Sequence, residues 1–332
     1  MMLRALRTIT CGLGMLAAAI TAPAFADDTM DTLNFGIIST ESQQNLKSVW
    51  NPFLADMSKK LGMEVKAYFA PDYAGIIQGM RFNKVDVAWF GNKSAMEAVD
   101  RSGGEIFAQT VDAEGNPGYW SLLVVHKDSP INSVEDMIAN RRELAFGNGD
   151  PNSTSGFLVP SYYVFAKNNI QPTDFKRTLN SSHEVNLFAV ANKQVDVATN
   201  NTENLRRFER NNPEKFKEIK VIWQSPLIPS DPIVWRKNLP ENVKKDVYSF
   251  FMNYGTTGDA QEVAILKGLE WAPFKPSSDL QLLPIRQLAL YKQLSGLSSQ
   301  GTLSDEQAAE LANIKNVLAA LNRQMSALEA ME

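Results

Sequence analysis

Short apolar runs alternate with amphipathic stretches through the first third of the chain. Residues 33–38, 64–69 and 85–90 have the length and composition of buried strands. Between them, Ser39 and Thr40 can cap a helix that ends near Gly62, and residues 73–82 have a helical pattern. This strand–helix order predicts a parallel sheet with helices on its faces.

The alternation continues further along the chain. Strands are predicted at 119–125, 144–147, 195–199 and 221–224, and helices at 134–140 and 153–168. A chain of 332 residues has room for two domains, and 44% hydrophobic with 21% charged residues is typical of a globular protein. The pattern therefore predicts an α/β protein.

One short pattern occurs twice. Residues 83–88 are Asn-Lys-Val-Asp-Val-Ala, and residues 192–198 are Asn-Lys-Gln-Val-Asp-Val-Ala. Each copy follows an apolar helix and enters a strand, which favours two similar Rossmann-like lobes, although so short a pattern can also recur by chance. Open α/β sheets bind ligands beyond the carboxyl ends of their strands, so two facing edges would form a cleft.

Turn-rich segments at 115–118 and 228–232 precede two further apolar runs. We place the two crossings of a hinge near 122–124 and 231–233. The expected organisation is a first lobe of residues 27–122 plus 232–299 and a second lobe of residues 123–231.

A helical tail follows at 300–332. Its apolar residues are spaced three and four apart, which predicts a short heptad seam. The seam consists of Leu311, Ile314, Leu318, Leu321, Met325 and Leu328. It can support a homodimer through the C-terminal helices, or it can pack on its own domain.

The N-terminus is typical of a secretory signal peptide at residues 1–26. Arg4 and Arg7 precede an uncharged apolar run too short to span a membrane, and a small-residue site predicts cleavage after Ala26. The single cysteine, Cys11, excludes a disulfide framework and follows a poor lipobox, so we expect a soluble periplasmic protein. A formal net charge of −4 argues against nucleic acid as a partner.

The candidate chemistry centres on residues 147–156, which read Gly-Asn-Gly-Asp-Pro-Asn-Ser-Thr-Ser-Gly. Ser153, Thr154 and Ser155 open the predicted helix, where unpaired N–H groups and the helix dipole favour an anion. An ordinary helix start needs only one such side chain. The segment therefore predicts a cradle for a tetrahedral oxyanion, with a plain helix cap as the alternative.

Other candidates lie near the predicted cleft. His183 precedes an apolar helix and would be protonated beside negative charge, whereas His126 is expected to be solvated. Tyr73 opens a helix, and Tyr119 lies beside the first crossing. Two acids, at positions 203 and 231, could hold a cation together, or each could be a solvated loop residue.

Residues 34–45, 71–84 and 147–160 resemble the periplasmic phosphonate-binding proteins of ABC-type phosphonate importers. The resemblance extends over about residues 33–295. It implies a two-lobed, type II-like binding protein that closes around its ligand and delivers it to a permease and ATPase complex in the inner membrane. It implies no catalytic reaction and no cofactor.

The same resemblance implies roles for particular residues. The phosphonate group would be held by Tyr73, Ser153, Thr154, Ser155 and His183. The amine of 2-aminoethylphosphonate would be met by Glu203 and Asp231, with Tyr119 in the same pocket. Phe90 stands where some relatives have tyrosine, which removes one hydroxyl near the cleft.

Three alternatives remain open from the residues themselves. An exported hydrolase could use a serine of the cradle with His183 and Asp231, but no Gly-x-Ser-x-Gly elbow is present. A protein that binds phosphate or another oxyanion would need no amine recognition. A purely structural protein would have no use for three consecutive hydroxyls. The sequence has no His-Glu-x-x-His motif, so we expect no catalytic metal site.

Overall fold

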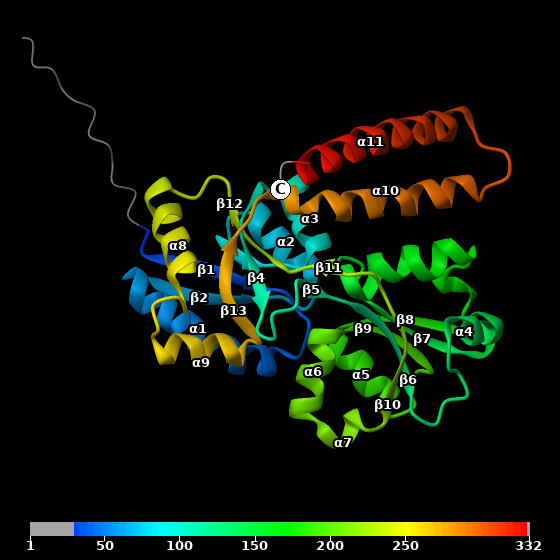
Figure 1. Cartoon of the computed structure of the whole chain (residues 1–332), viewed down its shortest axis with the longest axis horizontal. Coiled ribbons are helices and arrows are strands. Elements are labelled where there is room, and N and C mark those ends of the chain that lie inside the picture. Colours follow the sequence, from blue (N-terminus) through cyan, green and yellow to red (C-terminus); the bar gives the residue numbers. More distant parts are fainter. Residues whose placement is uncertain (1–29, 331–332) are drawn as a thin grey trace, which may run out of the picture.

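The computed structural model describes residues 30–330, so the predicted signal peptide and its cleavage site lie outside the described residues. Two α/β lobes lie side by side, and a pair of long helices lies above them in the view of Figure 1. Among residues 30–330, no helix combines the length and the hydropathy needed to cross a membrane.

Lobe 1 is built on a six-stranded sheet in the order β13-β4-β12-β3-β1-β2. The strands are β1 (Thr32–Ile37), β2 (Glu64–Phe69), β3 (Val87–Trp89), β4 (Gly104–Asp112), β12 (Pro232–Arg236) and β13 (Trp271–Pro276). The predicted parallel pairing holds for β2-β1-β3. The other half of the sheet, for which no pairing was predicted, is antiparallel: β12, β4 and β13 pair in this way, and β12 enters from the other lobe without a crossover helix.

Five helices belong to lobe 1. They are α1 (Gln43–Leu61), α2 (Tyr73–Arg81), α3 (Asn92–Arg101), α8 (Glu241–Asn253) and α9 (Ala260–Gly268). The cap of α1 is Ser42 rather than the predicted Ser39 or Thr40, and the helix ends at Gly62, whose φ of 66° suits glycine. Trp50 and Phe53 on α1 pack against the aromatic rings of α8 and β13 in the core.

Lobe 2 has a five-stranded sheet in the order β10-β6-β9-β7-β8. Its strands are β6 (Ser121–His126), β7 (Ala145–Gly149), β8 (Arg177–Ser181), β9 (Val197–Asn201) and β10 (Ile219–Gln224). Its α-helices are α4 (Val134–Asn140), α5 (His183–Ala191), α6 (Thr202–Asn211) and α7 (Pro213–Phe216). The predicted helix 153–168 is present but begins with wide turns, since the Leu158 N–H donates to the Ser153 carbonyl over 3.1 Å.

The recurring sequence pattern forms the same turn in both lobes. The helix ends, one residue takes a left-handed conformation (Asn83, φ 54°; Lys193, φ 57°), and an aspartate follows. Asp86 accepts a hydrogen bond from the Asn34 amide over 2.7 Å at β1. In lobe 2 its counterpart at position 196 accepts one from the Ala145 amide, also over 2.7 Å. In both lobes, the aspartate of the repeat therefore joins the turn to the backbone of the neighbouring strand.

The lobes are joined by two segments that pair with each other. Strands β5 (Gly118–Tyr119) and β11 (Ile228–Pro229) form a two-stranded antiparallel ribbon. Residues 122–124, where the first crossing was predicted, lie inside β6 of the lobe 2 sheet. We therefore propose that the hinge is the β5–β11 ribbon, and that lobe 2 begins at β6.

The C-terminal hairpin consists of α10 (Leu283–Ser298) and α11 (Asp305–Glu329), which lie side by side in Figure 1. α10 bridges the lobes, because Ile285 and Leu288 pack with Tyr119 of the ribbon and with Leu158 of lobe 2. The heptad seam of α11 packs on α10, where Ile314 and Leu318 meet Leu297, so much of the face predicted for self-association is covered within the chain.

The two aspartates of the repeat provide a matched test of buried charge. Asp86 is buried and also accepts from Arg236 Nε over 2.8 Å, whereas Asp196 is exposed. Asp86→Ala should lower the free energy of unfolding by on the order of 3 kcal/mol, because it leaves a guanidinium and an amide unpaired. Asp196→Ala should cost about 1 kcal/mol. Urea unfolding measures both, and equal losses would contradict the role given to Arg236.

Candidate functional site

The predicted residues meet where the two lobes face each other. Tyr73 opens α2 of lobe 1, and its backbone N–H donates to Asp150 Oδ2 of lobe 2 over 3.2 Å. The backbone N–H of Lys93, at the start of α3, donates to Thr154 Oγ1 over 2.8 Å. The helix starts of both lobes therefore converge on the segment predicted to be the anion cradle.

Each hydroxyl oxygen of the cradle already accepts an N–H group. Ser153 Oγ accepts from the Gly156 amide over 3.0 Å, and Ser155 Oγ accepts from Asn201 Nδ2 over 3.1 Å. Thr154 Oγ1 accepts from the Lys93 amide, as described above. A hydroxyl that accepts in this way still has its own proton to donate. The three buried side chains thus form a set of donors suited to an oxyanion.

Residues that the sequence did not single out hold the cradle in place. Ser121 Oγ on β6 donates to the Ser155 carbonyl over 2.6 Å, and Thr199 Oγ1 on β9 donates to the Gly156 carbonyl over 2.8 Å. A Cβ on Gly149 would lie 2.6 Å from the Gly156 backbone, so this close approach needs glycine. In the sequence, Ser121 and Thr199 are marked only as polar residues beside the apolar runs of their strands.

His183 lies at the start of α5 with its Nε2 3.4 Å from Ser153 Oγ. Burial, followed by the positive charge of Arg207, lowers the pKa of His183 to about 4. The charge beside the ring among the described residues is positive, so His183 is neutral at pH 7 in the unliganded protein. Its protonation beside a bound anion stays a prediction. Its Nδ1 is buried and has no hydrogen-bond partner among the described residues.

Tyr73 is buried beside the cradle and interacts with Ser153. Burial raises the pKa of Tyr73, and the charges of Asp150 and Asp231 raise it further. The phenol therefore keeps its proton and remains a donor. With His183 neutral, the side-chain donors at this end of the site are all uncharged.

Asp231 precedes β12 and is buried, which rules out the solvated-loop interpretation. Its Oδ1 accepts from the Tyr119 hydroxyl over 2.9 Å, and its Oδ2 accepts from Trp89 Nε1 over 3.2 Å. Burial raises the pKa of Asp231 well above its usual range, and the nearby Glu203 carboxyl raises it further. Trp89 was not predicted, because its burial identifies it only as a core residue.

Glu203 lies in the first turn of α6 and is partly buried. Burial raises the pKa of Glu203 to about 7, against the opposing charges of Arg207 and Arg206. The two acids therefore interact, and their negative charge is incompletely compensated by the protein. Together they can accept a cationic group beside the oxyanion cradle.

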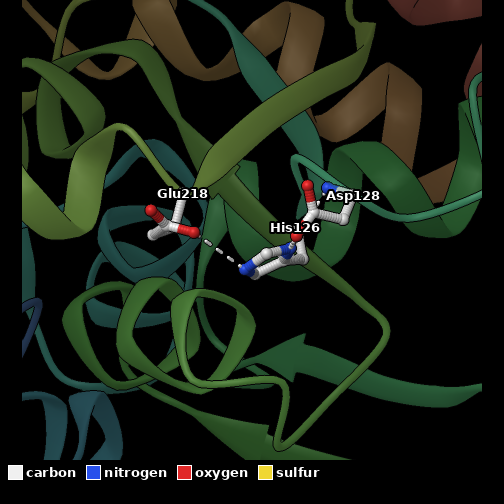
Figure 2. Close-up of side chains that lie close together, drawn as sticks. All are labelled: His126, Asp128 and Glu218. Carbon is white, nitrogen blue, oxygen red and sulfur yellow. Dashed lines mark hydrogen bonds and ion pairs between the residues drawn. The ribbon is translucent and has the colours of Figure 1, made fainter.

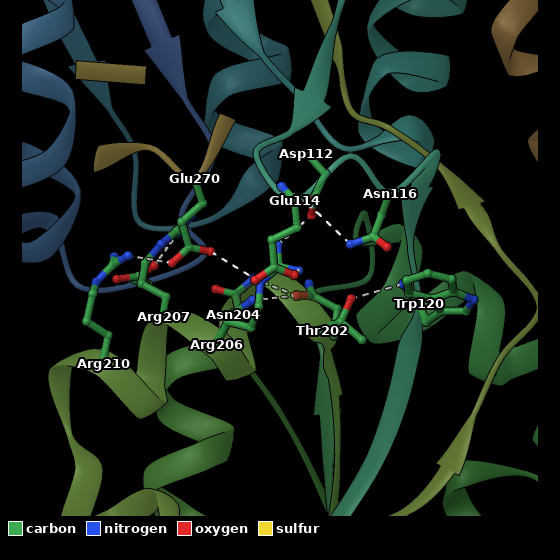
Figure 3. A network of polar contacts seen from close by, with 12 residues as sticks. Asp112, Glu114, Asn116, Trp120, Thr202, Asn204, Arg206, Arg207, Arg210 and Glu270 are labelled. Carbon is green, nitrogen blue, oxygen red and sulfur yellow. Dashed lines mark hydrogen bonds and ion pairs between the residues drawn. The ribbon is translucent and has the colours of Figure 1, made fainter. Parts of the chain in front are cut away.

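Three arginines of α6 form ion pairs with acids of lobe 1. Figure 3 labels these arginines and two of their partners, Asp112 and Glu270. The pairs are Arg206 Nη2 with Asp112 Oδ2 (2.5 Å), Arg207 Nη1 with Glu41 Oε1 (2.5 Å) and Arg210 Nη1 with Glu270 Oε1 (2.7 Å). Nothing in their spacing predicted these partners. The ion pairs hold the lobes together next to Glu203.

His126 is buried at the end of β6, which corrects the expectation that it is solvated. Figure 2 shows it with Asp128 and Glu218, whose ligand atoms lie close enough to suggest a metal site. However, Nδ1 accepts the Asp128 backbone N–H over 3.1 Å, so Nε2 carries the proton and donates to Glu218 over 3.1 Å. Lys127 also pairs with Glu218. These three residues therefore belong to a network of hydrogen bonds and ion pairs that satisfies their polar atoms without a metal ion.

The geometry also disfavours the hydrolase alternative. Ser153 and His183 are near each other, but the Nδ1 of His183 has no acid partner among the described residues. Asp231 is instead bonded to Tyr119 and Trp89. A base that no acid orients, with a pKa lowered to about 4, is poorly suited to activate a serine.

Comparison with known proteins shows the family of the chain. Residues 35–282 match the family model described as "ABC transporter, phosphonate, periplasmic substrate-binding protein". The chain is 64% identical over 315 residues to the phosphonates-binding periplasmic protein of Escherichia coli K12, covering 95% of this chain and 93% of that protein. These relatives are substrate-binding transport proteins rather than enzymes.

Solved structures show the same fold. The binding protein component of an ABC phosphonate transporter from Pseudomonas aeruginosa superposes with a TM-score of 0.88 at 61% identity, over 91% of this chain and all of that one. A Prochlorococcus marinus protein solved in complex with methylphosphonate has a TM-score of 0.70 at 23% identity, over 78% of this chain and 97% of that one. The chain therefore belongs to the family of periplasmic phosphonate-binding proteins, the substrate-binding components of ABC transporters.

Proposed function

We propose that this protein captures 2-aminoethylphosphonate and other alkylphosphonates in a cleft between its lobes. It then delivers them to a permease and ATPase complex in the inner membrane. The signal peptide directs it to the periplasm, with cleavage after Ala26. The observation that carries the proposal is one site in which neutral oxyanion donors lie beside two acids, the buried Asp231 and the partly buried Glu203.

The phosphonate group is assigned to Tyr73, Ser153, Thr154, Ser155 and His183. The three cradle hydroxyls keep protons to donate, and the wide helix start adds backbone N–H groups and its dipole. Hydrogen bonds to a charged acceptor are about twice as strong as neutral ones. A dianion therefore gains strong bonds without a counter-charge in the cradle.

The amine is assigned to Glu203 and Asp231, with Tyr119 orienting Asp231. An ammonium group stabilises the ionised form of both acids, so binding releases protons from them. Phosphate could use the same cradle, but it would place negative charge beside the acids. The acid pair therefore favours a zwitterionic aminoalkylphosphonate over an inorganic oxyanion.

A ligand panel tests the proposal directly. Calorimetry should give the tightest binding for 2-aminoethylphosphonate, then methylphosphonate, with phosphate and sulfate weaker. Ser155→Ala should weaken both phosphonates by roughly tenfold or more, because a bond to a charged group is lost. Ser161→Ala, further along the same helical segment, is the matched control and should bind normally. Tightest binding to phosphate would favour the inorganic-oxyanion alternative instead.

The raised pKa of Glu203 predicts the direction in which the preference for an amine-bearing ligand changes with pH. Below its pKa of about 7 the carboxyl is protonated and cannot pair with an ammonium. The ratio of affinities for 2-aminoethylphosphonate over methylphosphonate should therefore rise between pH 6 and pH 8. The phosphonate groups of the two ligands have different second pKa values, so each affinity is first corrected for the fraction of that ligand present as the dianion. In the unliganded protein, burial and then the charge of Arg207 lower the pKa of His183 to about 4, which lies below this range.

Glu203→Gln is the control for that titration. It should flatten most of the pH dependence of the ratio and cost aminoalkylphosphonates on the order of 1.5–3 kcal/mol, with little effect on methylphosphonate. It is cleaner than Asp231→Asn, which would also disturb Tyr119 and Trp89. If both ligands lost the same affinity, Glu203 would not be reading the amine.

Self-association through the C-terminal helices stays a prediction. Since the heptad seam packs on α10, a second copy would have to use the outer face of α11, where Val317 is 42% exposed. Sedimentation should then show a dimer at tens of micromolar and a monomer for Val317→Glu, with ligand binding retained. A monomeric wild-type protein under these conditions would end the dimer hypothesis.

A further inference from the structure

Gly91 lies at the junction between the two ends of the site. It follows β3 and caps α3, with φ −75° and ψ 162°. Its carbonyl accepts from the Ala95 amide over 2.8 Å and from Ser94 Oγ over 2.9 Å, so its position is fixed by the start of the helix. The residue before it, Phe90, is wholly buried in the lobe 1 core. Gly91 itself faces the site, because a Cβ built on it would lie near Thr154 and Asp231.

The missing side chain of Gly91 would point between the cradle and the acid. A Cβ built there would lie 3.3 Å from Thr154 Oγ1 and 3.9 Å from Asp231 Oδ1. These two oxygens belong to opposite ends of the site and to opposite lobes. Its third near neighbour is Ser94 Oγ, at 3.8 Å, so all three atoms are side-chain oxygens.

Neither oxygen can easily retreat from an added methyl group. Thr154 Oγ1 accepts from the Lys93 amide over 2.8 Å, and Lys93 is two residues from Gly91 on the same helix start. Asp231 Oδ1 accepts from the Tyr119 hydroxyl, and the other carboxylate oxygen accepts from Trp89. An added methyl group would therefore occupy the space between Thr154 Oγ1 and Asp231 Oδ1 without pushing either oxygen aside.

We propose that Gly91 is a specificity-determining residue whose bare Cα leaves room for the carbon chain of the ligand. The inference rests on the proposed function, because it takes the phosphonate group to lie at Thr154 and the amine at Asp231. Any side chain at position 91 would select against ligands that carry carbon on phosphorus. Oxyanions without a carbon substituent would be affected much less.

Gly91→Ala is a clean probe of this role. The φ and ψ of Gly91 lie in the extended region that alanine adopts without strain, so the variant should fold. Gly268→Ala is the matched control, because nothing lies within 4 Å of the Cβ it would add. The ligands are 2-aminoethylphosphonate, methylphosphonate and phosphite, which has hydrogen where the phosphonates have carbon.

Gly91→Ala should weaken 2-aminoethylphosphonate and methylphosphonate by about tenfold or more, because the added methyl group would overlap with the ligand's carbon. Phosphite affinity should change by less than about threefold. The control should match the wild type for every ligand. An equal loss for all three ligands, or no loss for the phosphonates, would overturn the inference while leaving the proposed function intact.

The wild-type titrations separate the two levels of failure. If wild type binds none of the phosphonates, the proposed function fails, and the inference fails with it. A crystal structure of wild type with 2-aminoethylphosphonate gives a second reading that does not depend on how the variant folds. A ligand carbon within about 4 Å of the Gly91 Cα would support the inference, and a chain that runs elsewhere would refute it.

Discussion

The burial of two neighbouring carboxyl groups is the constraint on which the rest of the site depends. Among the described residues, the hydrogen bonds to the carboxylate of Asp231 come from Tyr119 and Trp89, which are neutral donors. Burial raises the pKa of both Asp231 and Glu203, so each acid gains by meeting a positive charge. The acid pair is therefore suited to a positively charged partner.

Helix α6 links that charge balance to the contact between the lobes. It carries Glu203 in its first turn and, directly after it, the arginines that pair with acids of lobe 1. Because these arginines are committed to lobe 1, they offset the charge of Glu203 only in part. Burial, with a further contribution from Arg207, lowers the pKa of His183 and makes the opposite end of the site a set of uncharged donors in the unliganded protein. Helix α6 therefore influences the charge at both ends of the site, through Glu203 at one end and through Arg207 beside His183 at the other.

Local patterns along the chain were enough to predict the α/β fold and to single out residues that lie close together in the structure. The repeated Val-Asp-Val-Ala pattern reflects a real turn, because the aspartate and the left-handed residue act on neighbouring backbone. The three hydroxyls that open a helix were likewise visible as an excess over what a cap requires. The family resemblance then supplied the identity of the anion, which residue chemistry alone left open.

Only the tertiary structure decided which distant groups meet. Sequence periodicity reports whether a residue is buried, but not which strand lies beside it, so the antiparallel half of the lobe 1 sheet and the β5–β11 ribbon were missed. The seam of α11 looked the same whether it faced a second copy or α10. The lowered pKa of His183 depended first on its burial and then on the charge of Arg207, and both are set by folding. Apolar patterning thus determined the elements and their buried faces, whereas long-range contacts determined the charges and partners of the site.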